Sequence, residues 1–497
     1  MLNRTDKINA LWNGMTFTLI SLLSFVNFTL NYNSFPNSEF GLFILINSIF
    51  GIGYALDFGF GVSTIKLISE ARKNNDPKLV NSIFISFFGF FIMISTILVG
   101  VYVFYYFLFF SKTDFFLNND RDKTNIIYVL LTVSFFLKYI SNFVTKIFEG
   151  YAQFVLLGKI NLVLAFSYFF SVLAIFTFKL NITYLALFMF INSFLTLSTL
   201  FTISLLKLPE LQFKLSFFSL RILKKYAAYS INLQLSFLIG SFVDPVIKFL
   251  SGNFLGLNYV TFYETAKKII DLSNGLIFSI QKGLINKLSE NNAVGKLKEY
   301  INNEIFVYSK MSNYYSILIY GILNPLIFIF TFVWFKSFES AVIMLILFLP
   351  YSLINFGGCL YTVLMVEGKG VKLLIIQTLN FILISSSLYL SLSIVKSYVG
   401  LAGYYVATIL SIVIIMIIFI KQYEFKLKPF FSKVKMNKLF LLNIILIVEV
   451  FAILSFQSYF IYILSGFFIL YCVLFYSFIS YFYLMIMDKV KSFLVKD

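Results

Sequence analysis

One long apolar segment, Leu255 to Glu290, also carries charged residues, and this combination restricts the fold more than any other feature of the sequence. At about 100° per residue, the charged positions fall within roughly a third of the circumference of a helix. The i,i+4 spacing predicts two ion pairs on that face, Glu264 with Lys268 and Lys267 with Asp271. The five charged residues that share this face are Glu264, Lys267, Lys268, Asp271 and Lys282.

The cost of placing these charges in lipid decides what must surround them. On membrane-insertion scales, one Lys or Asp at the centre of a lipid-facing helix costs about 2.5 to 3.5 kcal/mol. Four such residues would together cost on the order of 10 kcal/mol on the same scales. The segment can therefore cross a membrane only if its charged face borders protein or water. The sequence predicts a hydrated polar cavity within the membrane.

The rest of the composition is that of a polytopic membrane protein. Of the 497 residues, 60% are hydrophobic and 12% are charged, and the mean hydropathy is +0.90. Histidine is absent and the two cysteines lie in apolar runs, so we expect neither a metal site nor a disulfide framework. A coupled H+ or Na+ would have to be held by carboxylates or oxygen dipoles, and no other cofactor is expected. No cleavable signal peptide is expected at the N-terminus.

Apolar runs long enough to span a bilayer predict an all-α polytopic membrane protein with about 14 transmembrane helices. Lys and Arg cluster in the even-numbered connections, which places these connections and both termini in the cytoplasm. The net charge of +17 is thus mainly an orientation signal, and no nucleic-acid partner is expected. The runs lie near residues 12–33, 40–65, 81–110, 125–147, 155–178, 182–205, 226–250, 256–282, 311–335, 338–363, 373–394, 398–420, 438–456 and 459–487.

A short repeat divides the chain. Ser69-Glu70 follows the second predicted helix and Ser289-Glu290 follows the eighth, 220 residues later. Helices one to six then correspond to helices seven to twelve, related by an axis along the membrane normal. The predicted domains are an N-terminal lobe at 1–210, a C-terminal lobe at 211–425, and two additional helices within 426–497.

Polar faces on three other predicted helices would supply the remaining walls of the cavity. Hydroxyl and amide side chains on membrane helices also join one helix to another, and this alternative stays open for them. Charge in lipid is costly, which favours a functional role for the lysines and for Asp244. The candidates are Asn27 on the first helix, Lys138 and Asn142 on the fourth, and Gln234, Asp244 and Lys248 on the seventh.

Carboxylates at helix irregularities are candidates for ion coupling. Pro245 follows Asp244, leaves the carbonyl of Ser241 without its usual donor, and predicts a kink in the seventh helix. This arrangement suits a small cation or proton, but a plain ion pair between Asp244 and Lys248 explains it equally well. Asp57 lies in a glycine-rich run of the second helix, and a lone neutralised carboxylate is an equal alternative there. The ion-coupling candidates are Asp57, Asp244, Glu264 and Asp271.

Several short motifs resemble the Wzx-type polysaccharide flippases of the multidrug/oligosaccharidyl-lipid/polysaccharide (MOP) exporter superfamily. The resemblance covers nearly the whole chain, although Asn286 stands where relatives often have Pro. The motifs are Leu255-Gly256, Tyr263, Ala266-Lys267-Lys268-Ile269, Leu288-Ser289-Glu290, Glu39-Phe40-Gly41-Leu42-Phe43, Asp57-Phe58-Gly59-Phe60-Gly61, Lys66-Leu67-Ile68-Ser69-Glu70 and Gly400-Leu401-Ala402-Gly403 through Thr408.

The resemblance implies two six-helix lobes in a MATE-like V shape around a cationic lumen, followed by two C-terminal helices. It implies that the protein flips undecaprenyl-diphosphate-linked oligosaccharide repeat units, as in O-antigen synthesis, across the bacterial inner membrane by alternating access. The implied partners are this glycolipid, membrane lipids and the polysaccharide polymerase machinery. Lys138, Lys248, Lys267 and Lys268 would hold the diphosphate or acidic sugars. The side chains of Asn27, Asn142 and Gln234 would contact the sugar.

Three other functions compete with this interpretation. No G-x-x-x-x-G-K-[ST] signature is present, so transport is expected to be coupled to an ion gradient or passive. A MATE-like multidrug cation exporter is disfavoured by the excess of Lys over carboxylates in the predicted lumen. A lipid II flippase is not separated from a Wzx-type protein by the sequence. An O-antigen polymerase would be an enzyme with a large charged external loop, whereas the external connections here are short, so we expect a transporter.

Overall fold

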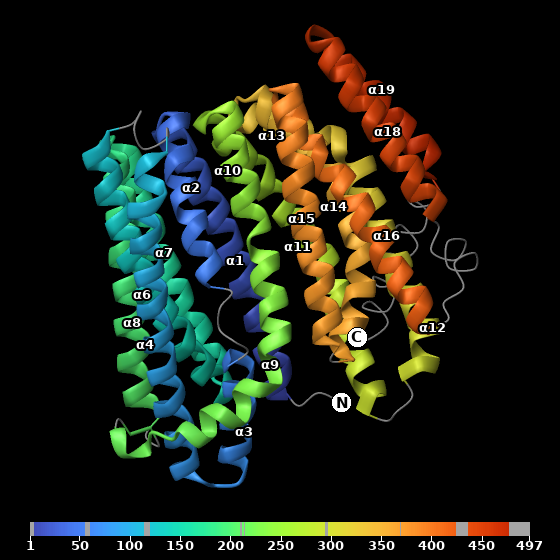
Figure 1. Cartoon of the computed structure of the whole chain (residues 1–497). Helices are drawn as coiled ribbons and strands as arrows, with labels where there is room; N and C mark the ends of the chain where they lie inside the picture. Colours follow the sequence, from blue (N-terminus) through green and yellow to red (C-terminus); the bar gives the residue numbers. More distant parts are fainter. Residues whose placement is uncertain are drawn as a thin grey trace. The chain divides into compact units, whose positions relative to one another are not determined.

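The computed structural model of the chain describes residues 4–54, 60–113, 120–208, 211–212, 214–293, 297–367, 369–423 and 436–476. Over these residues the secondary structure consists of helices, without strands (Figure 1). The chain forms two compact units, Met1–Thr261 and Phe262–Asp497. The lobe boundaries at 210 and 425 stay a prediction.

The first unit is built on long helices whose aromatic side chains fill the interior. The ring of Phe50 lies 4.7 Å from that of Tyr102 and 6.1 Å from that of Phe135, both buried. Helix α6 packs on α8, and α1 packs on α7. The helices are α1 (Arg4–Ser34), α2 (Asn37–Gly53), α3 (Phe60–Lys73), α4 (Pro77–Leu108), η1 (Phe110–Lys112), α6 (Arg121–Gly150), α7 (Phe154–Phe178), α8 (Ile182–Lys207), η2 (Leu215–Phe217), α9 (Leu220–Ser241) and α10 (Val243–Leu255).

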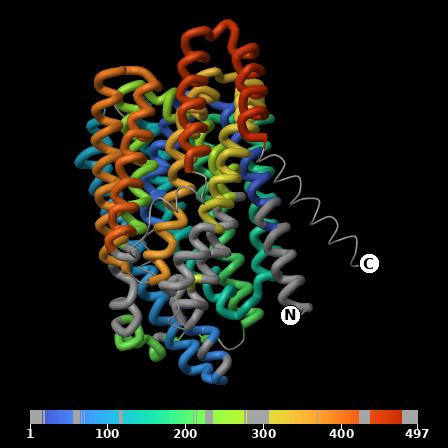
Figure 2. The backbone as a smooth tube through the Cα atoms, turned by 90° about the vertical axis from the view of Figure 1, so that its right-hand side faces the viewer, coloured from blue at the N-terminus to red at the C-terminus, as the bar shows by residue number. Residues whose placement is uncertain are grey.

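In the second unit, one central helix is buried along almost its whole length by the helices around it. This helix, α14, packs against α12, α13, α16 and α18. Figure 2 shows α18 and α19 as neighbouring antiparallel helices that end the described chain. The helices are α11 (Leu257–Ala293, beginning in the first unit), α12 (Leu297–Ile317), η3 (Leu318–Ile322), α13 (Asn324–Phe335), α14 (Phe338–Val366), α15 (Gly370–Val395), η4 (Tyr398–Ala402), α16 (Gly403–Tyr423), α18 (Met436–Ser455), η5 (Gln457–Tyr459) and α19 (Phe460–Leu474).

Short polar side chains set where several helices begin. Asp76 accepts a hydrogen bond from the backbone N–H of Leu79 at 2.9 Å, and Ser337 accepts one from Ser340 at 3.1 Å. Asn181 does the same for Thr183 at 3.1 Å. The first N–H groups of a helix have no partner within it, so these side chains stabilise helix ends close to the limits of the apolar runs.

The structure confirms the prediction of an all-α polytopic membrane protein. Within the described residues, 10 helices are long and apolar enough to cross a membrane, and 11 if one bent pair counts as a single span. The other three predicted spans coincide with α1, with α2 and α3, and with α11. The predicted total of about 14 is therefore not confirmed.

The bent pair lies at the apolar run 311–335 and contains an interruption that the run does not predict. Its two segments, Val307–Ile322 and Asn324–Phe335, meet at 53°, and the π-helix η3 precedes the bend. Pro325 lacks the N–H that would otherwise bond the carbonyl of Gly321, which interrupts the helical ladder at this point.

Candidate functional site

Helix α11 has a buried apolar face and a polar face, as the sequence predicts. Tyr263, Ala266, Ile270 and Ile277 recur at helical spacing and are fully buried. The four charged residues from Glu264 to Asp271 lie between them in sequence and share the opposite side of the helix. The apolar face fixes the helix in its unit and leaves the charges on the accessible side.

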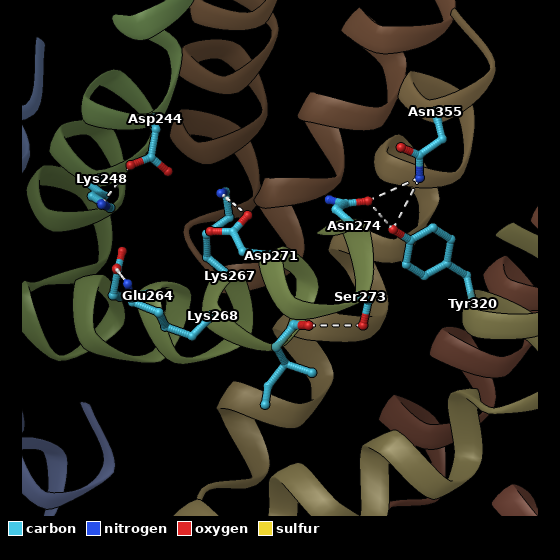
Figure 3. Close-up of polar contacts among 11 residues, drawn as sticks. Asp244, Lys248, Glu264, Lys267, Lys268, Asp271, Ser273, Asn274, Tyr320 and Asn355 are labelled. Carbon is cyan, nitrogen blue, oxygen red and sulfur yellow. Dashed lines mark hydrogen bonds and ion pairs between the residues drawn. The ribbon is translucent and has the colours of Figure 1, made fainter. Parts of the chain in front are cut away.

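The two predicted ion pairs on α11 are present (Figure 3). Lys267 Nζ lies 2.5 Å from Asp271 Oδ1, and Lys268 Nζ lies 3.6 Å from Glu264 Oε1. The side chains of Glu264 and Lys267 are 13% and 19% exposed, whereas those of Lys268 and Asp271 are 36% and 49% exposed. The charges thus compensate each other while one partner of each pair stays reachable by an ionic ligand.

A hydrogen-bond network continues this face, and the sequence reasoning missed it. Asn274 Oδ1 accepts from Tyr320 Oη at 2.5 Å and from Asn355 Nδ2 at 3.1 Å. Asn355 Nδ2 also donates to Tyr320 Oη at 3.2 Å, so the network joins α11, η3 and α14 (Figure 3). Asn274 follows Asp271 by three residues, so extending the helical face would have found it. Tyr320 lies on a π-helix, whose register no regular period predicts.

Helix α14 adds an aromatic contact to the same cluster. Lys267 Nζ lies 5.8 Å from the centroid of the Tyr351 ring. A cation at this distance from an aromatic face is attracted by the ring quadrupole. Lys267 is therefore held both by Asp271 on its own helix and by the Tyr351 ring on α14.

In the first unit, Asp244 and Lys248 form an ion pair on α10. Lys248 Nζ lies 2.6 Å from Asp244 Oδ2, and the side chains are 7% and 37% exposed respectively. Near Pro245, where the sequence predicts a kink, the helix is interrupted: α9 ends at Ser241 and α10 begins at Val243. The i,i+4 pair corresponds to the plain structural explanation that the sequence left open (Figure 3).

The other candidates of the first unit differ in accessibility. Lys138 and Asn142 are exposed on α6, and Lys138 Nζ lies 5.6 Å from the centroid of the Tyr54 ring. Asn27 on α1 is only 7% exposed. Asp57 and the side chain of Gln234 lie outside the described residues.

Part of the polar stripe on α6 joins helices. The Ser134 hydroxyl lies 2.7 Å from that of Ser193 on α8, and both are buried. This contact agrees with the alternative that hydroxyl groups connect neighbouring membrane helices.

Carboxylates and thiols do not gather into a metal site in the described part of the chain. No group of three or more His, Cys, Asp or Glu residues there is placed to hold a metal ion. The chemistry available on α11 is that of paired ammonium and carboxylate groups, with amides and a phenol beside them.

The family model described as "Polysaccharide biosynthesis protein" matches residues 8–291. The chain belongs to this polysaccharide biosynthesis protein family. All candidate residues of both units, from Asn27 to Asp271, lie within the matched stretch. No curated protein matches the sequence significantly.

Solved structures of MOP superfamily transporters share the fold of this family member. An inward-facing multidrug resistance MATE family transporter is 15% identical with a TM-score of 0.60, over 80% of this chain and 94% of that one. An outward-facing multidrug resistance MATE family transporter is 16% identical with a TM-score of 0.59, over 86% of this chain and 94% of that one. A MOP superfamily transporter from Pyrococcus furiosus is 14% identical with a TM-score of 0.57, over 84% of this chain and 95% of that one. The resemblance drawn from the sequence motifs is confirmed, and this multi-pass membrane protein of the polysaccharide biosynthesis family has the fold of MOP superfamily transporters.

Proposed function

We propose that this transporter flips undecaprenyl-diphosphate-linked oligosaccharide repeat units across the bacterial inner membrane by alternating access. Both termini would lie in the cytoplasm, and membrane lipids and a polysaccharide polymerase would be its neighbours. The observation that carries the proposal is the charged face of α11, in a chain of the polysaccharide biosynthesis family with a MOP transporter fold.

Lys267 and Lys268 have the chemistry that a diphosphate requires. An ammonium group donates charge-assisted hydrogen bonds to phosphate oxygens. Each lysine is paired with a carboxylate that a diphosphate would replace, so binding would exchange one ion pair for another. The displaced carboxylates of Glu264 and Asp271 would then have to be hydrated or neutralised. Lys138 and Lys248 are further candidates for acidic groups, and Asn27, Asn142 and Gln234 for sugar hydroxyls.

The test is glycan display in a strain that lacks its own flippase. We expect Lys267→Ala and Lys268→Ala each to lower display, and the double variant to abolish it while lipid-linked repeat units accumulate. The matched control is Lys369→Ala, because Lys369 also pairs with a carboxylate, Glu367 at 2.9 Å, but lies away from α11 in sequence. Normal display by the double variant, at normal protein levels, would contradict the proposal. Export of an organic cation in place of glycan would assign the multidrug function.

Ion coupling is tested by neutralising the carboxylates one at a time. The variants are Asp57→Asn, Asp244→Asn, Glu264→Gln and Asp271→Asn. Display by the wild-type protein should fall when the proton or sodium gradient is collapsed, and a coupling variant should lose that response. If all four variants respond as the wild type does, these residues do not couple transport to either ion.

A further inference from the structure

A carboxyl group is buried in the C-terminal helix pair and takes no part in the ion pairs of α11. Glu449 lies on α18, a membrane-capable helix of 20 residues, and is 0% exposed. It precedes the end of α18 by six residues, or about 9 Å at 1.5 Å per residue. A carboxyl group at such a position has no role in the mechanism proposed above.

Two hydrogen bonds reach the same oxygen of this carboxyl group. Asn324 Nδ2 donates to Glu449 Oε2 at 2.7 Å, and Tyr471 Oη donates to it at 2.7 Å. Asn324 is the first residue of α13, directly after the 53° bend, and Tyr471 lies on α19. Both residues are 0% exposed. The contact therefore joins three helices of the second unit.

The two remaining side-chain oxygens of Glu449 and Asn324 indicate whether the Glu449 carboxyl group carries a proton. Glu449 Oε1 and Asn324 Oδ1 are both buried, and neither accepts a hydrogen bond from any described residue. Two acceptors on paired groups repel each other and are costly to bury. A single proton on Oε1 turns that oxygen into a donor. Because Asn324 already donates to Oε2, a hydrogen bond from Oε1 to Oδ1 closes a cyclic acid–amide pair and satisfies both oxygens.

The groups packed around Glu449 do not offer it a cation. Tyr471 is the titratable group that faces it from α19, and α13 contributes the Asn324 amide. Helices α14 and α12 also pack against α18, and the side chains that they place on it are uncharged: Ser352 of α14 bonds to Asn443, and Asn313 of α12 lies against Met436. No ion pair to Glu449 forms within the described part of the chain. An isolated carboxylate is expensive in such surroundings, so neutralisation by a proton is favoured.

We propose that Glu449, Asn324 and Tyr471 form a proton-binding site, in which an acid–amide pair ties the C-terminal helices to the bend before α13. The proton comes from water and resides on Glu449 Oε1. Its loss would leave two facing acceptors, so the pair would open and α18 and α19 would loosen from the bend. The site concerns proton occupancy alone and does not depend on which substrate the transporter carries.

Infrared spectroscopy of the full-length protein in lipid nanodiscs tests the occupancy directly. At neutral pH the wild type should show the C=O stretch of a protonated carboxylic acid, and Glu449→Gln should lack it. Glu449→Gln preserves the shape and both accepted hydrogen bonds, so we expect it to fold. The control Glu367→Gln removes a carboxylate that is paired with Lys369 and should leave the band unchanged. An unchanged band in Glu449→Gln would overturn the proposal.

A second variant keeps the acid and changes only its surroundings. Tyr471→Phe removes one of the two hydrogen bonds to Oε2, so the same band should shift to higher frequency. A band that does not move would show that the acid lies elsewhere, even if Glu449→Gln fails to fold.

Thermal unfolding at several pH values tests the link to helix packing. The folded state holds a proton that the unfolded chain releases at neutral pH, so raising the pH should lower the midpoint of the wild type. Glu449→Gln should show no such decrease over the same interval. Equal pH dependence in both proteins would overturn the proposal. Stabilisation by Na+ at constant pH, lost in Glu449→Gln, would instead assign a sodium site and also overturn it.

Discussion

A methyl group on Gly41 would come within 2.0 Å of the carbonyl oxygen of Leu257, so the first turns of α2 and α11 approach each other closely. Thr261 Oγ1 donates to the carbonyl of Asn37 at 2.7 Å in the same contact. The backbone of α11 therefore leaves no room for a side chain at position 41, and glycine is required there for steric reasons.

Gly41→Ala should destabilise the protein, because the obstacle is backbone and not a flexible side chain. Overpacking of this kind costs about 1 to 3 kcal/mol. The midpoint of thermal unfolding in detergent or nanodiscs measures the effect. Gly51→Ala is the matched control, because it lies on the same helix with nothing within 4 Å of an added Cβ. It should be neutral or slightly stabilising. Equal midpoints for both variants would contradict the close approach.

Asp244→Asn should cost more stability than Lys248→Met. The Lys248 side chain is 7% exposed and that of Asp244 is 37% exposed, so removing the carboxylate deprives the more buried charge of its ion pair. Breaking a buried pair costs about 3 to 5 kcal/mol, whereas the half-exposed Asp244 can be hydrated after Lys248 is removed. Unfolding midpoints of both single variants and the double variant measure the coupling. If the double variant is as unstable as the sum of the singles, the two side chains do not interact.

Tyr320→Phe should lower stability by about 1 kcal/mol, because it removes the hydroxyl that both donates to Asn274 and accepts from Asn355. The ring would still fill its buried position, so the change isolates the hydrogen bonds. Tyr462→Phe on α19 is the control, since Tyr462 is 77% exposed. Thermal unfolding of the two variants should separate them. If the unfolding midpoint of Tyr320→Phe equals that of Tyr462→Phe, the hydrogen-bond network makes no net contribution to stability.

Asp120 makes one helix start sensitive to acid. Its side chain accepts from the backbone N–H of Lys123 at 3.2 Å, and this hydrogen bond is the largest cause of the lowered pKa of its carboxyl group. A lowered pKa in the folded state means that the contribution to stability is present above the unfolded pKa and is lost as pH falls through the folded pKa. Asp120→Asn keeps a capping side chain without titrating. On acidification the wild type should lose stability relative to this variant, by a small amount because the group is exposed. Parallel pH profiles would contradict the capping role.

Local periodicity was sufficient to predict the charged face of α11 from the sequence. The pairs Glu264–Lys268 and Lys267–Asp271 depend only on residues four positions apart, and any helix brings such residues together. The helix interruption near Pro245 was equally predictable, because proline removes a backbone donor wherever it occurs. The membrane class followed from apolar runs whose lengths match a bilayer.

Tertiary packing alone decided which distant side chains meet. Tyr320 reaches Asn274 across 46 residues, and Asn324 reaches Glu449 across 125. No spacing rule relates such positions, since their contact depends on how α11, η3, α14 and α18 pack. The sequence showed Glu449 as one acidic residue in an apolar run. The three-dimensional structure placed an amide and a phenol on a single oxygen of that residue, because burial in a helix bundle pairs polar groups according to where the helices pack.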